Sequence, residues 1–262
     1  MNYTFCSQTH PGRVRDNNED SVVFDDATYL GVLADGMGGY NAGEVASGMA
    51  TAFIKTELSK WLSEAGEQAS IREVRRALEI CVDNANRSIF IASRTNPQYA
   101  GMGTTLVVGV FQADLLVLGH IGDSRCYRLR GNELLQITKD HSLLQEQIDA
   151  GLLTPRQAAI SPLRNLVTRA VGVENEVQLE INEHRVEAGD IYLMCSDGLS
   201  DMMEDTAISS ILQNGSALTQ MANELVSQAN KNGGRDNITV LLTQAHSAPE
   251  KRGLISRWLG KQ

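Results

Sequence analysis

The sequence predicts an α/β protein in which antiparallel β-sheets are covered by helices packed outside them. Strand-like apolar runs occur as close neighbours, such as residues 104–111 and 115–129, with connections short enough for hairpins. Stretches with helical spacing of apolar residues are grouped between these runs instead of alternating with them one by one. A doubly wound parallel sheet needs regular strand–helix–strand repeats, so this order disfavours it.

Composition favours a single domain. The chain has 262 residues, of which 42% are hydrophobic, with 5 prolines and no linker-like tract or internal repeat. We expect one domain over residues 1–245 and a short tail over 246–262.

No stretch approaches the ~18 apolar residues of a membrane helix, and the N-terminus has no basic and apolar leader, which predicts a cytoplasmic protein. The net charge of -9 argues against general nucleic-acid binding.

The four cysteines give no sign of a zinc site or a disulfide framework. They are scattered along the chain without close pairs, and two of them stand in apolar, strand-like runs. We therefore predict reduced, buried and chemically inert thiols at Cys6, Cys81, Cys126 and Cys195.

The first predicted strand, residues 21–24, follows a segment rich in ionic side chains. The sequence GRVRDNNED places Arg15, Glu19 and Asp20 directly before this strand or at its start. A solvated loop is the alternative reading of such a segment, since charged loops are common.

The stretch LGVLADGMGG, residues 30–39, combines a buried strand with a glycine-rich turn. The apolar run stops at Asp35, so the sheet would hold this carboxylate at the end of the strand. Gly36, Gly38 and Gly39 allow positive φ and a close approach of the backbone to a ligand. This is a suitable place for a carboxylate that binds a metal ion.

Two long helices are predicted next, over about residues 42–61 and 71–93, from apolar residues at helical spacing. In the first, the residues predicted to face the core are Val45, Met49, Phe53 and Leu58.

The middle of the chain reads as consecutive strands. Residues 104–111 and 115–129 are joined by a short connection that suits a hairpin, and Gly131 marks a second turn before another strand. Gly122 and Asp123 interrupt the second run. An acidic residue inside such a run must face solvent, pair with a cation or bind a metal, because burying it alone is costly.

The last part of the chain, from residue 142 onward, is predicted to contain helices, an irregular segment and two further strands flanked by aspartates. A helix capped by Ser142 is predicted over residues 142–151, and residues 154–162 resemble an irregular surface flap. The strand at 190–198 ends in Asp197, and Asp236 stands at the entrance of the last strand. Between these two aspartates, helices are predicted over residues 204–213 and 216–230.

Five aspartates share one local context, at the end, entrance or break of an apolar strand: Asp20, Asp35, Asp123, Asp197 and Asp236. Each one alone could be a turn or cap residue, but together they suggest a site of oxygen ligands, which Mg²⁺ and Mn²⁺ prefer. Two such ions ~3.5–4 Å apart activate water for attack on phosphorus. Arg15 is the candidate for binding the phosphate, because its guanidinium can bond two oxygens at once.

These residues lie in motifs that resemble the bacterial branch of the PPM (type 2C) metal-dependent serine/threonine protein phosphatases. The resemblance covers about residues 7 to 243 and runs in the family's order through RDNNED, ADGMGGYNAGEVAS, GMGTTL, HIGDSR, ITKDHS, LVTRAVG, CSDGLSD and GGRDNITV.

The resemblance implies a four-layer αββα sandwich of two antiparallel sheets flanked by helix pairs, with two Mn²⁺ or Mg²⁺ ions at one end. It further implies that Asp35 bridges the ions, that Gly36 binds one through its carbonyl, and that Asp197 and Asp236 complete the pair. By the same resemblance, Glu19 and Asp20 act mainly through metal-bound water, Arg15 binds the phosphate, and Asp123 with Asp197 forms a weaker third metal site.

One position departs from the family pattern. Many bacterial relatives have a histidine where this chain has Tyr40, and a tyrosine with an ordinary pKa near 10 is a poor acid at neutral pH. Metal-bound water is therefore the expected proton donor. His120 and His141 also lie near motif residues, and we predict structural roles for both.

The predicted reaction is hydrolysis of phosphoserine and phosphothreonine in proteins, which would reverse a Ser/Thr kinase; a monomer is expected. Two alternatives are a catalytically inactive phosphoprotein-binding member of the fold and a phosphatase dedicated to one regulator. The tail carries four basic residues and one acidic residue. If it is helical, an apolar face could dock on a partner or an anionic membrane, with a frayed terminus as the alternative.

Overall fold

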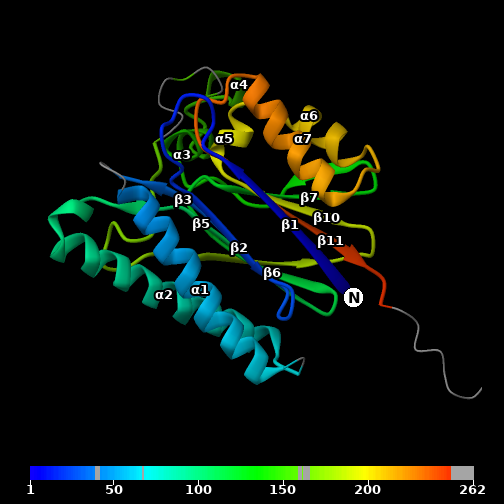
Figure 1. Cartoon of the computed structure of the whole chain (residues 1–262), viewed down its shortest axis with the longest axis horizontal. Coiled ribbons are helices and arrows are strands. Elements are labelled where there is room, and N and C mark those ends of the chain that lie inside the picture. The colour runs from blue at the N-terminus through cyan, green and yellow to red at the C-terminus, as the bar shows by residue number, and fades with distance from the viewer. Residues whose placement is uncertain (39–41, 67, 159–160, 162–165, 249–262) are drawn as a thin grey trace, which may run out of the picture.

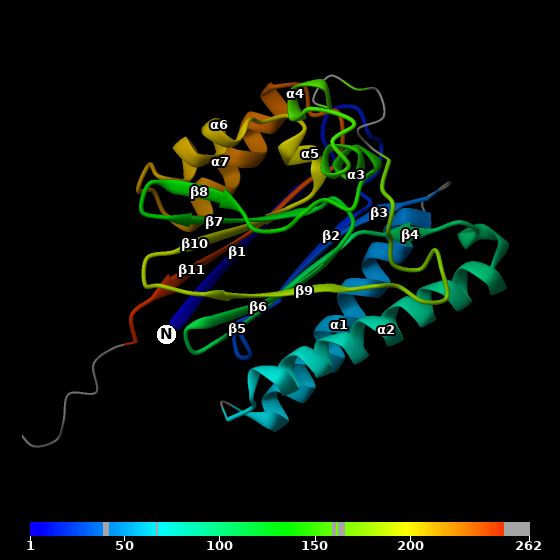
Figure 2. The same ribbon diagram turned by 180° about the vertical axis from the view of Figure 1, so that it is seen from behind.

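The computed structural model describes residues 1–38, 42–66, 68–158, 161 and 166–248. Two antiparallel sheets pack face to face, and a pair of helices covers the outer face of each (Figures 1 and 2). This arrangement confirms the predicted fold class. Most of the predicted tail lies outside the described residues, from residue 249 onward.

The first sheet is formed by strands from both ends of the chain. Its strand order is β1-β11-β10-β7-β8. The bounds are Asn2–His10 for β1, Ile238–His246 for β11, Ile191–Cys195 for β10, Arg125–Arg130 for β7 and Glu133–Gln136 for β8. Nine residues of β1 pair with β11, so the N-terminal segment, for which no strand was predicted, is held by the last strand of the chain.

The second sheet is formed by the central part of the chain, in the order β2-β3-β5-β6-β9, with the short strand β4 attached to β3. The bounds are Asp20–Asp25 for β2, Leu30–Met37 for β3, Gly103–Thr104 for β4, Leu106–Gln112 for β5, Leu115–Ile121 for β6 and Glu180–Arg185 for β9. The predicted hairpin between β5 and β6 is confirmed by their antiparallel register, and β9 is a strand that the sequence pattern did not reveal.

The run at 115–129, predicted as one interrupted strand, is two strands in different sheets. β6 ends at Ile121 in the second sheet and β7 begins at Arg125 in the first. Gly122 makes the crossover with a φ of +100°, and a Cβ there would collide with Thr105. The residue that follows, Asp123, therefore lies where the chain passes from one sheet to the other.

Helices cover both sheets. α1 (Ala42–Ala65) and α2 (Ile71–Thr95) pack on the second sheet, whereas α6 (Asp205–Leu212) and α7 (Leu218–Lys231) pack on the first. The short helices are η1 (Pro97–Tyr99), α3 (Leu143–Asp149), α4 (Pro155–Ala158) and α5 (Asp197–Ser200). Ser142 caps α3 as predicted, through its hydroxyl and the amide of Gln145. α4 lies in the segment that was predicted to be irregular.

The buried face of α1 is centred beside the predicted one. Val45, Met49 and Phe53 are half-buried and pack against the core, whereas the fully buried positions include the small residues Ala46 and Ala50. Small side chains let this helix lie close to β3. The fully buried positions of the helix are therefore set by this close packing and not by the spacing of its large apolar residues. Of the predicted core residues, Leu58 is fully buried.

The four cysteines are free thiols; Cys81, Cys126 and Cys195 are buried as predicted, whereas Cys6 is only half-buried at the edge of the first sheet. Burial raises the pKa of the Cys81 and Cys195 thiols to about 12, which keeps them protonated and unreactive. Within the described part of the chain, no helix combines the length and apolarity that crossing a bilayer requires.

Candidate metal centre

Asp20 and Asp35 lie opposite each other in the ladder between β2 and β3. Asp35 stands inside β3 and not at its end, because Gly36 and Met37 continue the strand and pair with β4. The main chain of Asp35 is held from two sides: its amide donates to the Thr105 hydroxyl at 3.0 Å, and its carbonyl accepts from the Thr105 amide at 2.8 Å. The sheet therefore fixes the carboxylate at a defined position.

The other two central aspartates come from the first sheet. Asp197 is the first residue of α5, directly after β10, and Asp236 precedes β11 by two residues. Gly198 packs so closely on the Asn237 carbonyl that a Cβ at Gly198 would collide with it. This contact holds the segments of Asp197 and Asp236 against each other.

Asn237 is a buried residue that positions the acidic loop, although the sequence pattern did not single it out. Its Oδ1 accepts from the Glu19 amide at 2.7 Å, and its Nδ2 donates to the carbonyls of Pro11 at 3.0 Å and Asn17 at 2.8 Å. Loop 11–19 is thereby tied to the residue next to Asp236. The only sequence signal was its place beside an aspartate at a strand entrance.

Ser196 is a second positioning residue that was missed. Its hydroxyl donates to Asp20 Oδ2 at 2.7 Å and accepts from the Thr239 amide at 3.0 Å. Because Asp20 belongs to the second sheet and Ser196 follows a strand of the first, this bond connects the two sheets beside the aspartates.

Glu19 and Gly36 meet at the start of α1. The Gly36 amide donates to the Glu19 carbonyl at 3.0 Å, and the Ser47 hydroxyl donates to the same carbonyl at 2.6 Å. A Cβ at Gly36 would collide with the carbonyls of Gly43 and Glu19, and one at Gly43 would lie 2.9 Å from Glu19 Oε2. Only glycines allow this approach of backbone and carboxylate.

Arg15 lies at the edge of the same group. Its Nη2 donates to Asp236 Oδ2 at 2.7 Å, and 52% of its side chain is exposed. The hydrogen bond to Asp236 raises the pKa of the guanidinium further above its ordinary value. Glu19 and Asp197 add to this effect, so the arginine lies within the field of the acidic residues and also reaches solvent.

The aspartates strongly oppose one another's ionisation. Burial raises the pKa of Asp35 well above its ordinary value, and the charges of Asp20, Asp197 and Asp123 raise it further. Burial and the Asp123 charge have the same effect on the pKa of Asp197. The pKa of Asp20 is raised to about 6, mainly by burial, and that of Asp123 to about 6 by burial and by Asp140. Such a group needs cations to hold all its charges at neutral pH.

The donor set fits divalent metal ions. It consists of carboxylate oxygens and a close-packed glycine carbonyl, the ligands that Mg²⁺ and Mn²⁺ prefer. The Oδ1 atom of Asp20 is buried and has no hydrogen-bond partner, so an acceptor remains available for a cation. Charge repulsion and this unpartnered oxygen are independent signs of a metal centre.

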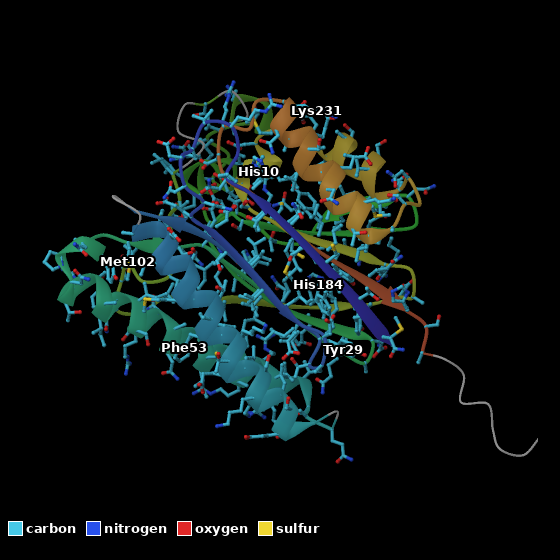
Figure 3. All side chains as sticks on the ribbon, in the orientation of Figure 1. His10, Tyr29, Phe53, Met102, His184 and Lys231 are labelled. Carbon is cyan, nitrogen blue, oxygen red and sulfur yellow. The ribbon has the colours of Figure 1, made fainter. Side chains whose placement is uncertain are left out.

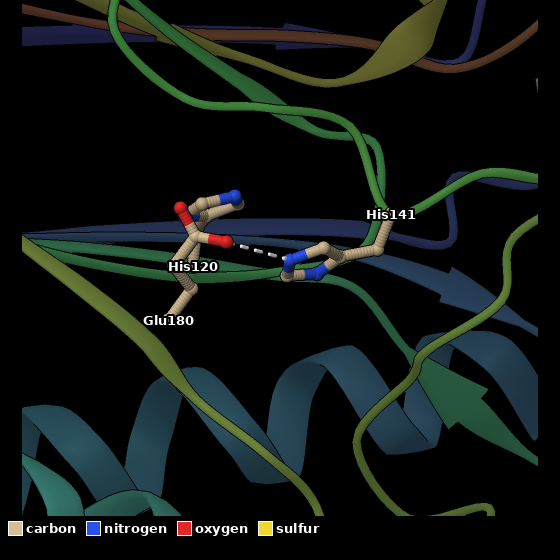
Figure 4. A group of neighbouring side chains, drawn as sticks. All are labelled: His120, His141 and Glu180. Atoms are coloured by element: carbon tan, nitrogen blue, oxygen red, sulfur yellow. Dashed lines mark hydrogen bonds and ion pairs between the residues drawn. The ribbon is translucent and has the colours of Figure 1, made fainter. Parts of the chain in front are cut away.

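A second group of potential ligands lies near the Gly122 turn. Figure 4 shows His120, His141 and Glu180, whose ligand atoms lie within 4.8 Å of one another. No trio of the described aspartates meets this limit. His141 Nδ1 accepts from the Gly122 amide at 3.1 Å, so its proton is assigned to Nε2, which donates to Glu180 at 3.2 Å. Metal binding at Nε2 would require losing that proton and the bond to Gly122. The geometry therefore supports the predicted structural role of both histidines, whose rings stack 4.7 Å apart.

Two expectations fall partly or wholly outside the described residues. Tyr40 belongs to the gap at 39–41, and the predicted flap at 154–162 is described only over residues 154–158 and 161.

Comparisons with known proteins show the family of this chain. The family model described as "Protein phosphatase 2C" matches residues 8–243. A serine/threonine phosphatase stp of Listeria monocytogenes is 36% identical over 240 residues, which is 90% of this chain and 94% of that protein. The crystal structure of the Mycobacterium tuberculosis serine/threonine phosphatase PstP/Ppp has a TM-score of 0.86 and 38% identity, covering 94% of this chain and 100% of that one. A PstP catalytic domain in complex with 2 manganese ions has a TM-score of 0.81 and 37% identity, covering 94% and 99%.

Proposed function

The chain belongs to the protein phosphatase 2C family and is a metal-dependent serine/threonine protein phosphatase, and from this premise we propose which residues carry the reaction. The observation that supports the proposal is the convergence of Asp20, Asp35, Asp197 and Asp236 from both sheets, where each raises the pKa of another. Two Mn²⁺ or Mg²⁺ ions bound there would supply a water of lowered pKa for attack on phosphorus.

In this proposal Asp35 would be the ligand shared by both ions, and Gly36 would contribute its carbonyl oxygen. Asp197 and Asp236 would hold the ions from the first sheet, whereas Glu19 and Asp20 would act from the second, mainly through metal-bound water. Asp123 lies close enough to raise the pKa of both Asp35 and Asp197, which supports its role with Asp197 in a third, weaker site.

Arg15 binds the substrate phosphate in this proposal. One nitrogen of its guanidinium is bonded to Asp236, and the other donors remain in a half-exposed side chain. A planar guanidinium can therefore connect the acidic site with the outer oxygens of a phosphate. The phosphoryl group transfers directly to water, without a covalent intermediate on the protein.

The alternative of a catalytically inactive phosphoprotein-binding member is disfavoured. Such a member would be expected to have lost metal ligands, but the carboxylates proposed to hold the ions are all present. A phosphatase dedicated to one regulator would have the same site and stays open as a narrower version of this function.

The first experiment measures hydrolysis of p-nitrophenyl phosphate and phosphothreonine peptides with Mn²⁺, with Mg²⁺ and with a chelator. Turnover is expected with either metal and is expected to disappear with the chelator, because the carboxylates alone cannot activate water. Asp197→Ala, which removes a proposed ligand, is expected to lose most of the activity. Full activity in the chelator, or an unaffected Asp197→Ala variant, would show that the reaction does not use this centre.

The protein acts on phosphorylated protein substrates, as the names of its relatives indicate. We further propose that it works as a monomer in the cytoplasm and reverses a cognate Ser/Thr kinase. The compatible observation is the absence of a membrane-crossing helix among the described residues.

The basic tail, residues 246–262, is proposed to dock on a partner or an anionic membrane surface. The support comes from sequence alone: four basic residues against one acidic residue, with apolar residues interspersed. Truncation after Ala245 is expected to weaken binding to anionic liposomes or to partner proteins while leaving hydrolysis of p-nitrophenyl phosphate unchanged. Unchanged binding in both assays would exclude the docking role.

A further inference from the structure

A basic pocket lies between β1 and α7, beside the loop that leads to the metal centre. It has a volume of about 340 Å³, and its polar lining includes His10, Arg13 and Lys231. Figure 3 shows His10 at the end of β1 and Lys231 at the end of α7, on the same side of the sandwich. We refer to this cavity as the basic pocket.

The charge of the basic pocket is opposite to that of the protein as a whole. The chain has a net charge of -9, but none of the described residues that line the cavity carries a carboxylate. Glu224, an acidic residue of α7, accepts a hydrogen bond from Asn214 at 3.0 Å. A local concentration of positive groups on an acidic protein attracts anions selectively.

His10 adds a directed donor to the two cations. Its Nδ1 accepts from the Gly12 amide at 2.9 Å. The ring proton of a neutral imidazole is then on Nε2, so this atom donates a hydrogen bond. The basic pocket thus combines a guanidinium, an ammonium and an imidazole N–H.

The basic pocket is physically connected to the metal centre. The Arg13 amide donates to the Gly234 carbonyl at 2.7 Å, and Gly234 lies two residues before Asp236. Arg13 is also two residues before Arg15, so their Cα atoms are at most ~7 Å apart. A peptide bound at Arg15 through its phosphate can therefore reach the basic pocket within a few residues.

We propose that the basic pocket binds an anionic residue of the protein substrate, two to four positions from the phosphorylated residue that is hydrolysed. The inference rests on the proposed function of the neighbouring centre. Two to four extended residues span roughly 7–14 Å, which matches the short connection from Arg15 to the pocket. A second phosphorylated residue is the strongest ligand, because it carries about -1.5 to -2 charges against the single charge of a glutamate.

The test uses the full-length, Mn²⁺-loaded enzyme and a set of phosphothreonine peptides. Each peptide places alanine, glutamate or a second phosphothreonine at two, three or four positions on either side of the phosphothreonine. The variant Arg13→Gln/Lys231→Gln is compared with Arg72→Gln/Arg87→Gln, which removes two exposed positive charges from α2 on the other sheet. p-Nitrophenyl phosphate, which is too small to reach the pocket, reports the metal centre alone.

For the wild type, kcat/KM is expected to rise in the order alanine, glutamate, phosphothreonine for at least one spacing. The Arg13→Gln/Lys231→Gln variant is expected to lose about three- to tenfold of kcat/KM on the anionic peptides, because exposed charge pairs contribute modestly. The advantage of anionic peptides is also expected to shrink with added salt. The α2 variant is expected to behave as wild type.

Three results would overturn the inference. The first is that the wild-type enzyme has the same kcat/KM on all the peptides. The second is that the Arg13→Gln/Lys231→Gln variant loses as much kcat/KM on the alanine peptides and on p-nitrophenyl phosphate as it does on the anionic peptides. The third is an equal loss by the α2 variant, which would indicate a general charge effect. If the wild type hydrolyses none of these substrates with Mn²⁺, the proposed function itself has failed, and this outcome is distinct from the other three.

Discussion

Replacing Asp35 with asparagine is expected to lower kcat on p-nitrophenyl phosphate by on the order of 10³-fold or more at saturating Mn²⁺. Asparagine keeps the size of the side chain and the main-chain bonds to Thr105, so the strand should form as before. What is lost is the negative charge proposed to bind both ions. Steady-state kinetics together with metal analysis of the purified variant would measure the effect.

The fold of this variant can be checked separately from its activity. Because Asp35 is buried beside Asp20 and Asp197, its replacement by a neutral group should leave the metal-free protein at least as stable as wild type. Arg15→Ala is the matched contrast: it should mainly raise KM, because it removes phosphate binding and leaves the metal ligands in place. An Asp35→Asn variant with near wild-type kcat would contradict the bridging role.

The metal-free protein is expected to lose stability as the pH rises from about 4.5 to 6.5. Burial raises the pKa of Asp20 and of Asp123 to about 6, above the value near 3.9 in the unfolded chain. In this window the folded state binds more protons than the unfolded state, so the free energy of unfolding falls with increasing pH. Across this window the loss is roughly 3–4 kcal/mol for the two groups, or a fall in Tm of roughly 10 °C.

Metal should reverse this trend. Binding requires deprotonated carboxylates, so Mn²⁺ should raise Tm strongly at pH 7.5 and little at pH 4.5. Calorimetry with and without a chelator would measure both effects. The pKa of Asp190 is lowered beside Arg130, so this group acts at lower pH and leaves the window nearly unaffected. Burial lowers the pKa of His141 and His184 from their ordinary value, so these two groups act inside the window with the opposite sign and offset part of the loss. Asp20→Asn should flatten the pH dependence, and an equally steep curve for that variant would contradict the assignment.

Much of the fold could be predicted because local signals agreed with the final structure. The Ser142 cap and the hairpin between β5 and β6 depend on neighbouring residues, so the sequence reveals them directly. β1 and β9 are held by partners far along the chain, and their own patterns are weak. The change of sheet at Gly122 depends on Thr105, a contact that no local pattern encodes.

The candidate site also contains residues that the sequence predicts and residues that it does not. The aspartates could be predicted because five of them recur at the end, entrance or break of an apolar strand, although each one alone is an ordinary turn residue. Asn237 and Ser196 could not be, since asparagine and serine are ordinary loop residues and their importance comes from bonds across 218 and 176 positions of sequence. Positioning by distant partners is a tertiary property, which explains why the carboxylates were recognised and the residues that hold them were not.

The connection between loop 11–19 and Asn237 has a consequence for protein synthesis. Glu19 and Asn237 stand at opposite ends of the chain, and β1 finds its partner β11 only when the last strand exists. A ribosome-bound chain that has not yet released residues 236–246 lacks three parts of the site. These are the proposed ligand Asp236, the residue Asn237 that holds loop 11–19, and strand β11, which pairs with β1. The proposed metal centre can therefore form only after residues 236–246 have left the ribosome.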